Sequence, residues 1–298
     1  RNTSRLFSIA RILAQEDALF IIDDLQVAPA LSGFFRVFST RKPNKRKGEK
    51  LAAALERLGP TFIKLGQALS TRSDLIGDEL ADDLGKLRDN LPPFPAYIAR
   101  KIIEEELKQP ISTLFSEFND TPVAAASIAQ VHKATTKDGR IAAVKILRPD
   151  IEKAFARDLD LFFWIAEIIE KRIHGWRRLK PVQVVQTFKE SIFFELDLRF
   201  EAAAASEMAD NLKTHSPGFS IPTIDWNLSS HRVLTMDWVD GIPFSDIEAI
   251  KNSGFDANTI LTKAANSLFS QVFKDGFFHA DLHPGNLFLD KKGDLVAV

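Results

Sequence analysis

The spacing of apolar residues changes near Ile111, and this change narrows the folds open to the chain more than any other feature. Upstream, apolar residues recur at helical spacing, whereas downstream they gather in short runs at 115–123, 128–134 and 141–147. The pair Asp138-Gly139 separates the last two runs and is typical of a β-hairpin turn. The sequence therefore predicts an α+β fold in which a helical region precedes an antiparallel sheet.

Helical patterns dominate the first part of the chain. Apolar residues at helical spacing run through 5–38, and further helices are predicted at 51–69, 78–89 and 95–107. We therefore predict an N-terminal helical extension over residues 1–110.

The rest of the chain alternates helices with strands. Helices are predicted at 150–173, 181–212 and 258–274, with short strands on both sides of 227–230 and a terminal hairpin around Lys292-Gly293. Three antiparallel strands, a long helix, two more strands, a helix and a polar loop are the plan of the two-lobed protein-kinase fold. We accordingly expect a first lobe with inserted helices at 111–240, and the start of a truncated second lobe at 241–298.

Composition excludes several classes of site. The 298 residues include no cysteine, which rules out disulfides, thiol nucleophiles and zinc or iron–sulfur sites with cysteine ligands. The 39 basic and 40 acidic residues nearly cancel, so no overall field attracts nucleic acid. The longest apolar run, Leu161–Ala166, is far shorter than the roughly 18 residues of a membrane-spanning helix.

The strongest local motif is HADLHPGN at 279–286, which follows a predicted helix and precedes a hairpin. An Asp and an Asn five positions apart match the catalytic loop of kinases, where the carboxylate orients the attacking group and the amide oxygen holds Mg²⁺. We therefore assign these roles to Asp281 and Asn286. The alternative is a transition-metal site at His279, Asp281 and His283, since alternate residues of an extended segment share one face.

Lys145 lies in the apolar segment Ala143-Val144-Lys145-Ile146. This segment matches the V-A-I-K motif of kinases, whose lysine binds nucleotide phosphates. A lysine after an apolar strand is often only an edge residue, so the motif gains its weight from the catalytic-loop pattern downstream. We expect Lys145 to share the catalytic role with Asp281.

The turn before the second strand reads Ala124-Ala125-Ala126-Ser127, at the place where kinases carry a glycine-rich loop. Glycine suits that loop because backbone N–H groups must approach phosphates in conformations that glycine tolerates best. Alanine makes the loop stiffer. We therefore expect this segment to bind nucleotide in a geometry that an ordinary protein kinase does not use.

Four motifs in order make the chain resemble the UbiB family of atypical kinase-like proteins, also called the ABC-one or aarF family. Residues 59–72, GPTFIKLGQALSTR, look like its KxGQ signature. The alanine-rich loop, an ExD signature at Glu195-Leu196-Asp197 and the segment 279–286 follow in the family's order. The resemblance covers nearly the whole chain.

The resemblance implies roles that spacing alone does not give. In this family the KxGQ helix folds over the site where a protein substrate would bind, and the ExD motif lies near the same pocket. Lys64 and Gln67 would thus form a latch with Glu195 and Asp197, because a lysine is attracted to two carboxylates. Such a latch would exclude peptides and favour ATP hydrolysis or phosphorylation of a small molecule.

Two further site positions follow from the kinase plan. Glu201 is the candidate partner of Lys145, and Glu195 is a competitor that the sequence leaves open. The stretch 234–241 resembles the hinge between kinase lobes. Backbone groups from Asp237 to Val239 are therefore expected to bind the adenine of a nucleotide.

The ends of the chain lead to the expectation of a fragment. The chain begins with Arg1 and ends on the strand-like run Leu295–Val298, after which a kinase would place the Asp that binds Mg²⁺. We therefore expect the 298-residue chain, taken alone, to be inactive.

The resemblance implies a kinase-like ATPase that uses ATP and Mg²⁺ and supports ubiquinone biosynthesis. Family members act at membranes with polyprenyl lipid intermediates, so nucleotide, a membrane surface, these lipids and other biosynthesis proteins are the expected partners. The basic stretch Arg41–Lys50 is either a solvated linker or a contact with an anionic membrane. The expected location is the cytoplasmic side of a bacterial inner membrane, peripheral or anchored by segments outside this chain.

Two other functions stay open. One is a small-molecule kinase of the aminoglycoside or choline kinase type, whose loops also run H-x-D-x-H-P-x-N; the helices before residue 110 argue against it. The other is a non-catalytic scaffold gated by nucleotide, against which the retained Lys145, Asp281 and Asn286 argue. A hydroxylase role finds no support, since the chain has neither a G-x-G-x-x-G fingerprint nor a credible iron ligand set.

Overall fold

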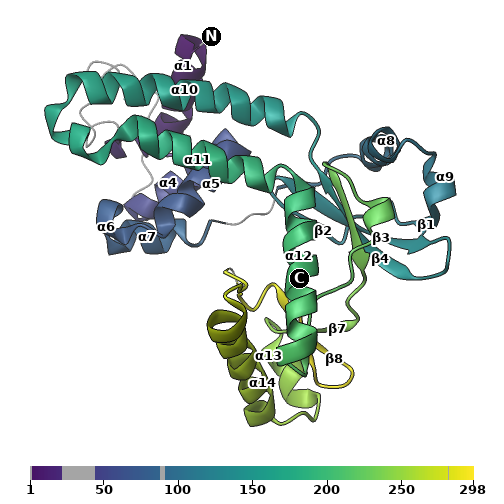
Figure 1. The fold of residues 1–298 in the computed structure, drawn as a ribbon. Helices are drawn as coiled ribbons and strands as arrows, with labels where there is room; N and C mark the ends of the chain where they lie inside the picture. Colours follow the sequence, from purple (N-terminus) through teal and green to yellow (C-terminus); the bar gives the residue numbers. More distant parts are fainter. Residues whose placement is uncertain (1, 22–43, 88–90, 281) are drawn as a thin grey trace. The chain divides into compact units, whose positions relative to one another are not determined.

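The computed structural model describes residues 2–21, 44–87, 91–280 and 282–298 (Figure 1). Part of the predicted helical stretch, the start of the basic stretch and Asp281 lie outside the described residues. The chain forms two compact units. The helical unit comprises Arg1–Pro93, Ala125–Ala129 and Arg148–Phe193, and the mixed unit comprises Phe94–Ala124, Gln130–Leu147 and Phe194–Val298.

The helical unit is built mainly from helices. They are α1 (Asn2–Gln15), α4 (Lys47–Leu58), α5 (Pro60–Ser70), α6 (Ser73–Ile76), α7 (Asp78–Leu84), α10 (Ile151–Arg172), the 3₁₀ helix η2 (His174–Leu179) and α11 (Pro181–Glu195), whose last two residues belong to the mixed unit. The predicted single helix at 51–69 is wrong. Gly59 adopts a φ of 104°, which ends α4, and Pro60 begins α5 because its fixed φ suits the first helical position.

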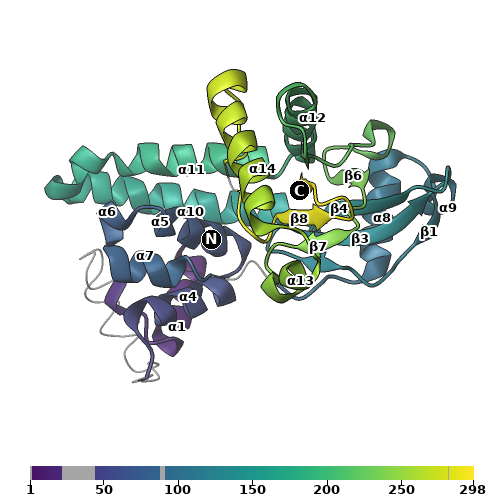
Figure 2. The same cartoon turned by 90° about the horizontal axis from the view of Figure 1, so that it is seen from below.

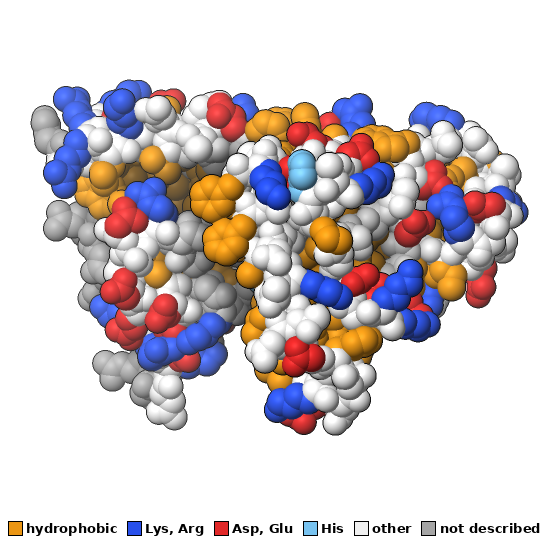
Figure 3. Space-filling model, turned by 60° about the horizontal axis from the view of Figure 1, so that its bottom comes forward, with side chains coloured by type: hydrophobic (Ala, Val, Ile, Leu, Met, Phe, Trp, Pro, Cys, Tyr) orange, Lys and Arg blue, Asp and Glu red, His pale blue; other side chains and the backbone are white. Residues whose placement is uncertain are grey.

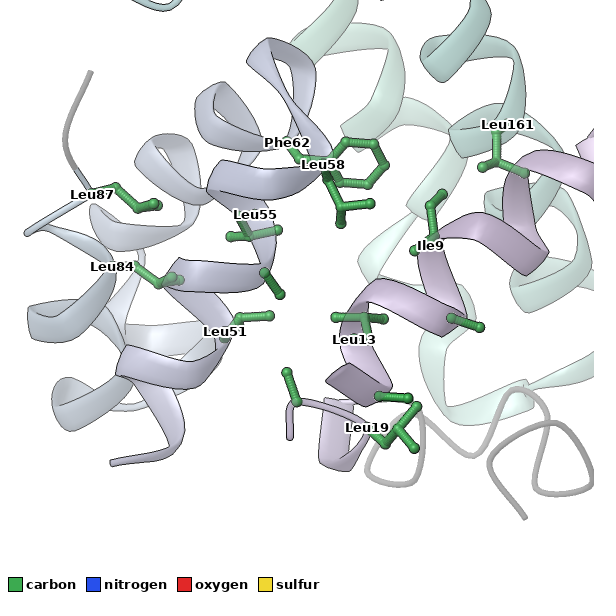
Figure 4. Close-up of a cluster of buried hydrophobic side chains, with 14 residues drawn as sticks. Ile9, Leu13, Leu19, Leu51, Leu55, Leu58, Phe62, Leu84, Leu87 and Leu161 are labelled. Atoms are coloured by element: carbon green, nitrogen blue, oxygen red, sulfur yellow. The ribbon is translucent and has the colours of Figure 1, made fainter. Parts of the chain in front are cut away.

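The core of the helical unit joins five of these helices (Figure 4). Leucines of α4 face apolar residues of α1 and α7, and Phe62 of α5 packs edge-to-face on Phe162 of α10, with ring centroids 5.2 Å apart. Burial of each such side chain stabilises the fold by about 1.5–3 kcal/mol. The labelled members are Ile9, Leu13, Leu19, Leu51, Leu55, Leu58, Phe62, Leu84, Leu87 and Leu161.

A buried ion pair ties α1 to α10. The Asp158 carboxylate is 3% exposed, and Arg5 donates to its two oxygens at 2.8 and 3.0 Å. Arg5 also donates to the carbonyl of Leu58 at the end of α4. Because a buried carboxylate has lost its hydration, it needs such donors, and they fix the mutual positions of these three helices.

Helices α10 and α11 run side by side as a helical hairpin (Figures 1 and 2). Phe162 and Phe188 pack with centroids 6.3 Å apart, and the Lys189 ammonium lies 5.9 Å from the Phe163 ring. Among the described residues, Ile192 is the buried member of α11. Most of the outer face of α11 is therefore exposed.

The mixed unit contains an antiparallel sheet with strand order β1-β3-β4-β6, in which β2 pairs with β3. Its strands are β1 (Phe115–Phe118), β2 (Ala124–Ala125), β3 (Ala129–Thr136), β4 (Ile141–Leu147) and β6 (Val233–Asp237). Helix α8 (Ala96–Leu107) packs against β4 and β6, and α9 (Ile111–Leu114) leads into β1. The predicted α+β class and the predicted hairpin at Asp138-Gly139 are confirmed.

The second half of the mixed unit has its own sheet and core. The sheet order is β5-β9-β8-β7, formed by Phe219–Ser220, Leu295–Ala297, Leu287–Asp290 and Gly241–Pro243. Around it lie α12 (Leu198–His215), η3 (Trp226–Leu228), α13 (Ile247–Asn252), α14 (Ala257–Ser270) and the π-helical turn η4 (Gln271–Asp275). Leu289 and Leu295 are fully buried at its centre.

The predicted helix at 181–212 is also wrong, since α11 ends at Glu195 and α12 begins at Leu198. Asp197 has extended backbone angles, and its carboxylate accepts a hydrogen bond from the Arg199 N–H, which makes it the N-cap of α12. The predicted helix at 258–274 is confirmed as α14 with its π-helical turn.

Apolar side chains also line the outside of α14 and η4, as the orange surface in Figure 3 shows. Phe269 and Phe273 are exposed and stack on each other with centroids 6.0 Å apart. Within the described part of the chain, no helix combines the length and the apolar character needed to cross a bilayer.

Gly66, in the middle of the KxGQ segment, offers a test of the helical core. A Cβ at Gly66 would lie 2.4 Å from Leu87 Cδ1 and 2.7 Å from Leu55 Cδ1. We expect Gly66→Val to lower the free energy of unfolding by about 1–3 kcal/mol, because the added side chain overpacks the core. Urea unfolding measures this.

Gly175→Val is the matched control, since a Cβ at Gly175 meets no atom within 4 Å and its φ is not in the left-handed region. The control should change the free energy of unfolding by no more than about 0.5 kcal/mol. Equal effects of the two substitutions would contradict the close packing at Gly66.

Candidate functional site

Lys145 is placed by the pleat of β4. Ala142, Val144 and Ile146 are buried on one face of this strand, so Lys145 projects from the other face. Its Nζ lies 2.8 Å from each carboxylate oxygen of Glu201. The two side chains are 27% and 43% exposed, so the ion pair is accessible to a charged ligand.

Glu201 lies in the first turn of α12. Of the two acids that the sequence leaves open as partners of Lys145, the structure therefore pairs Glu201 with it. Glu195 belongs to the preceding helix, on the other side of the break at Asp197. An exposed ion pair of this kind contributes about 0–1 kcal/mol to stability, so its main effect is to orient the lysine.

Asp197 is engaged locally. Besides accepting from the Arg199 N–H at 3.1 Å, its carboxylate pairs with the Arg199 guanidinium at 2.7 and 2.9 Å. These hydrogen bonds to Arg199 lower the pKa of Asp197 below its usual value, against a smaller opposing effect of burial. The Asp of the ExD motif therefore caps α12 and stays charged at neutral pH.

The residues of the expected latch fall in different units. Lys64 and Gln67 lie half-buried on α5 of the helical unit, whereas Glu195 and Asp197 belong to the mixed unit. The latch thus stays a prediction. Gly66, between the two KxGQ residues, serves close packing against Leu55 and Leu87.

The alanine-rich loop is held by an arginine that sequence reasoning missed. The Ala126 N–H donates to the Ala129 carbonyl at 2.8 Å, which closes a tight turn around the buried Ser127. Arg148 Nε donates to the Ala126 carbonyl at 2.9 Å, and its other nitrogens donate to the carbonyls of Leu91 and Pro92. This network restrains the loop beyond what alanine alone imposes.

The predicted hinge begins at the end of β6. The Asp237 N–H donates to the Thr223 carbonyl and the Trp238 N–H donates to the Ile141 carbonyl, at 2.9 and 3.0 Å. These two N–H groups are bound within the protein and are not available to adenine. The backbone groups still predicted to bind adenine are therefore the N–H of Val239 and the carbonyl groups of the segment Asp237 to Val239.

Three cations restrain the side chains of this hinge. Arg140 contacts Asp237 at 3.1 Å and also pairs with Asp138 and Asp225, each at 2.7 Å. The Lys133 ammonium lies 4.7 Å from the ring centroid of Trp238, and Lys291 pairs with Asp240. We call Arg140, Lys133 and Lys291 the hinge clamp. Sequence reasoning missed all three because the hinge residues that they contact are distant from them in the chain.

The segment 279–286 is described except for Asp281. The His279 N–H donates to the side chain of the buried Gln271 at 3.1 Å, and the Asn286 N–H donates to the His283 carbonyl at 2.9 Å. The Asn286 carbonyl accepts from Val298, so this residue lies beside the end of β9. Among the described residues no cluster of three or more histidine and acidic side chains could hold a metal ion, and the alternative site with Asp281 stays outside them.

Two substitutions at Asp197 separate its capping role from its charge. Asparagine caps helices as well as aspartate does, whereas alanine does not. We expect Asp197→Ala to lower the free energy of unfolding by about 1 kcal/mol and Asp197→Asn to lower it by clearly less. Urea unfolding of both variants measures this, and an equal loss for the two would show that the charge, rather than the cap, stabilises α12.

The pairing of Arg140 with Asp138 should make the stability of the protein depend on pH. Hydrogen bonds from Arg140, and then from Thr136, lower the pKa of Asp138 from 3.8 to about 2. The stabilisation from this carboxylate is therefore fully present above about pH 4 and is lost as the pH falls toward about 2.

Arg140→Gln should remove this dependence. We expect the parent protein to be more stable than the variant by a constant amount above about pH 5, and the difference to shrink as the pH falls below about 4. Urea unfolding over a pH series measures it. A difference that stays constant to the lowest pH at which both proteins fold would contradict the clamp.

Comparison with known proteins relates this site to a family. The model of the ABC1 atypical kinase-like domain matches residues 86–298. A protein of Marinobacter nauticus named "Probable protein kinase UbiB" is 46% identical over 249 residues, which are 84% of this chain and 45% of that protein. A protein of the same name from Shewanella pealeana is 40% identical over 279 residues, which are 91% of this chain and 51% of that protein.

A solved structure shares the fold. It is described as "The complex structure of Rv3197-erythromycin from Mycobacterium tuberculosis", is 31% identical and superposes with a TM-score of 0.57 over 82% of this chain and 61% of that chain. The chain spans about half the length of the curated relatives it matches. The expected kinase-like fold and the resemblance to UbiB are confirmed, and the chain belongs to the ABC1 atypical kinase-like family.

Proposed function

We propose that the chain carries the nucleotide site of a UbiB-type, kinase-like ATPase that acts in ubiquinone biosynthesis. The observation that carries the proposal is the pairing of Lys145 with Glu201, because this lysine–glutamate ion pair is what kinases use to present a cation to nucleotide phosphates. Its partial exposure keeps that cation accessible.

The residue types that we assign to the site suit Mg-ATP. Lys145 supplies a positive charge for the phosphates, the Asn286 amide oxygen is a ligand type that Mg²⁺ accepts, and backbone groups at Val239 suit the adenine edge. Mg²⁺, which the Asn286 side chain would help to hold, would neutralise charge on the phosphates. We propose that the restrained loop Ala124–Ser127 takes part in phosphate binding through backbone N–H groups other than that of Ala126, which is bound to the Ala129 carbonyl.

Residues of this chain would then have separate roles in the reaction. Lys145, oriented by Glu201, offsets charge on the transferred phosphoryl group, and Asp281 orients the attacking water or alcohol. Lys64 and Gln67 are proposed, as the resemblance implies, to keep peptides out of the site.

The pathway and the partners rest on the relatives. Proteins named UbiB match most of this chain, and the name implies ubiquinone biosynthesis. We extend to this protein the polyprenyl lipid partners, the other biosynthesis proteins and the inner-membrane location that the resemblance implies. We propose these partners and this location for the whole protein. The curated relatives are about twice as long as the segment over which they match this chain.

Nucleotide binding tests the proposal directly. We expect Mg-ATP or Mg-ADP at about a hundred times its dissociation constant to raise the stability of the full-length protein by about 2.7 kcal/mol in a thermal-shift titration. Lys145→Met should abolish the shift, because it removes the phosphate-binding cation. Glu201→Gln should weaken it.

Lys101→Met is the matched control, since Lys101 is an exposed lysine that pairs with Glu105 on α8. The control protein should show the full shift. Absence of any shift in the parent protein would overturn the nucleotide site of the ATPase and favour the non-catalytic scaffold. Transfer of phosphate to an added alcohol would favour the small-molecule kinase.

A further inference from the structure

The far end of the α10–α11 hairpin is strongly basic. We define the tip as Lys171–Lys180, which contains the end of α10, η2 and the residue before α11. The 19 residues from Lys171 to Lys189 include no Asp or Glu, although the whole chain is close to neutral. The basic residues of this span are Lys171, Arg172, Arg177, Arg178, Lys180 and Lys189.

The side chains of half of these cations make no ion pair, hydrogen bond or ring contact with the described part of the chain. Lys171 pairs with Glu167 and Arg177 Nε donates to a backbone carbonyl of α10. Within the described ranges, Arg172, Arg178 and Lys180 form no ion pair and are exposed. A group of exposed like charges repels itself, so an anionic surface close by would relieve that repulsion.

Apolar side chains accompany the cations. Leu179, inside the tip, is 41% exposed, and Val184, one turn into α11, is 58% exposed. Trp176, which directly precedes the two arginines of η2, is half-buried. Figure 3 shows Lys and Arg side chains gathered with apolar ones at the left end of the molecule, where α10 and α11 meet in Figure 1.

The basic stretch Arg41–Lys50 differs from the tip in the contacts that its cations make. Residues 41–43 lie outside the described residues, and three of the cations that follow them make contacts inside the helical unit. Arg46 pairs with the buried Asp83, Lys50 pairs with Asp17, and the Lys47 ammonium lies 5.3 Å from a phenylalanine ring of the same unit. These cations hold helices together, whereas Arg172, Arg178 and Lys180 make no such contact among the residues described.

We propose that the tip of the α10–α11 hairpin is the contact of this protein with an anionic phospholipid surface. Arg172, Arg178 and Lys180 bind lipid phosphates, and Leu179 enters the headgroup region. Cations next to exposed aliphatic side chains match such an interface, where charge attracts the protein and apolar area adds to binding. The inference does not depend on the proposed nucleotide site.

Vesicle co-sedimentation tests the proposal. The full chain is mixed with vesicles of phosphatidylcholine alone, or of phosphatidylcholine with phosphatidylglycerol. The tip variant carries Arg172→Glu, Arg178→Glu and Lys180→Glu. The matched control carries Lys101→Glu, Lys213→Glu and Lys251→Glu, which change the net charge equally but lie on exposed surfaces of the mixed unit.

We expect the parent and the control to bind the anionic vesicles, with affinity that falls as salt is added, and to leave neutral vesicles unbound. The tip variant should bind at least about a hundredfold more weakly, because each cation near an anionic surface contributes roughly a fivefold factor. Leu179→Ser, which keeps every charge, should weaken binding by a smaller factor. Circular dichroism checks that each variant is folded. If the triple charge reversal prevents folding, the double variant Arg178→Gln with Lys180→Gln replaces it as a milder change.

Three outcomes would overturn the proposal. They are equal binding by the tip variant and the control, equal binding of the parent to neutral and anionic vesicles, and no binding of the parent to either. Binding of the tip to RNA or to an acidic peptide, with vesicles left unbound, would assign this surface to another class of partner.

Discussion

The alternation of β4 is the constraint on which the candidate site depends. Val144 and Ile146 are fully buried against the residues of α8, and a strand that buries these two must point Lys145 the opposite way. In the register with β6, Lys145 lies opposite Leu234, which is fully buried like its neighbours Val233 and Thr235, so β6 is buried on both faces there. A slip of one residue would bury the lysine and expose the core, so packing of apolar neighbours determines where the cation lies.

The partner of that lysine is placed by different means. The exposed Lys145–Glu201 ion pair is too weak to hold α12, whose position follows from the burial of Leu198 and Ala202 and from a hydrogen bond of the Leu198 N–H to the His231 carbonyl. The Asp197 cap fixes where the helix begins, and Glu201 follows one turn later. The helix start, rather than the charge attraction, therefore brings the carboxylate to the lysine.

The sequence predicted the features that depend on local pattern. The strand of Lys145, the hairpin at Asp138-Gly139 and the final hairpin follow from short-range patterns: runs of apolar residues in the strands and turn residues between them. The break at Asp197 was missed because apolar spacing continues through it, although an Asp ahead of a helical stretch is a capping signal. Arg140 and Arg148 were missed for another reason: their acceptors lie far away in sequence, and only the folded chain brings them together.

The signature residues of this family accordingly divide by physical task. Gly66 of the KxGQ segment provides room for two leucines, and Asp197 of the ExD segment begins a helix. Lys145 and Glu201, by contrast, gain little stability from each other and lie where a ligand can reach them. A motif match alone does not separate these tasks. Burial and hydrogen bonding do, because a residue already committed to packing or to a cap has less freedom to take part in chemistry.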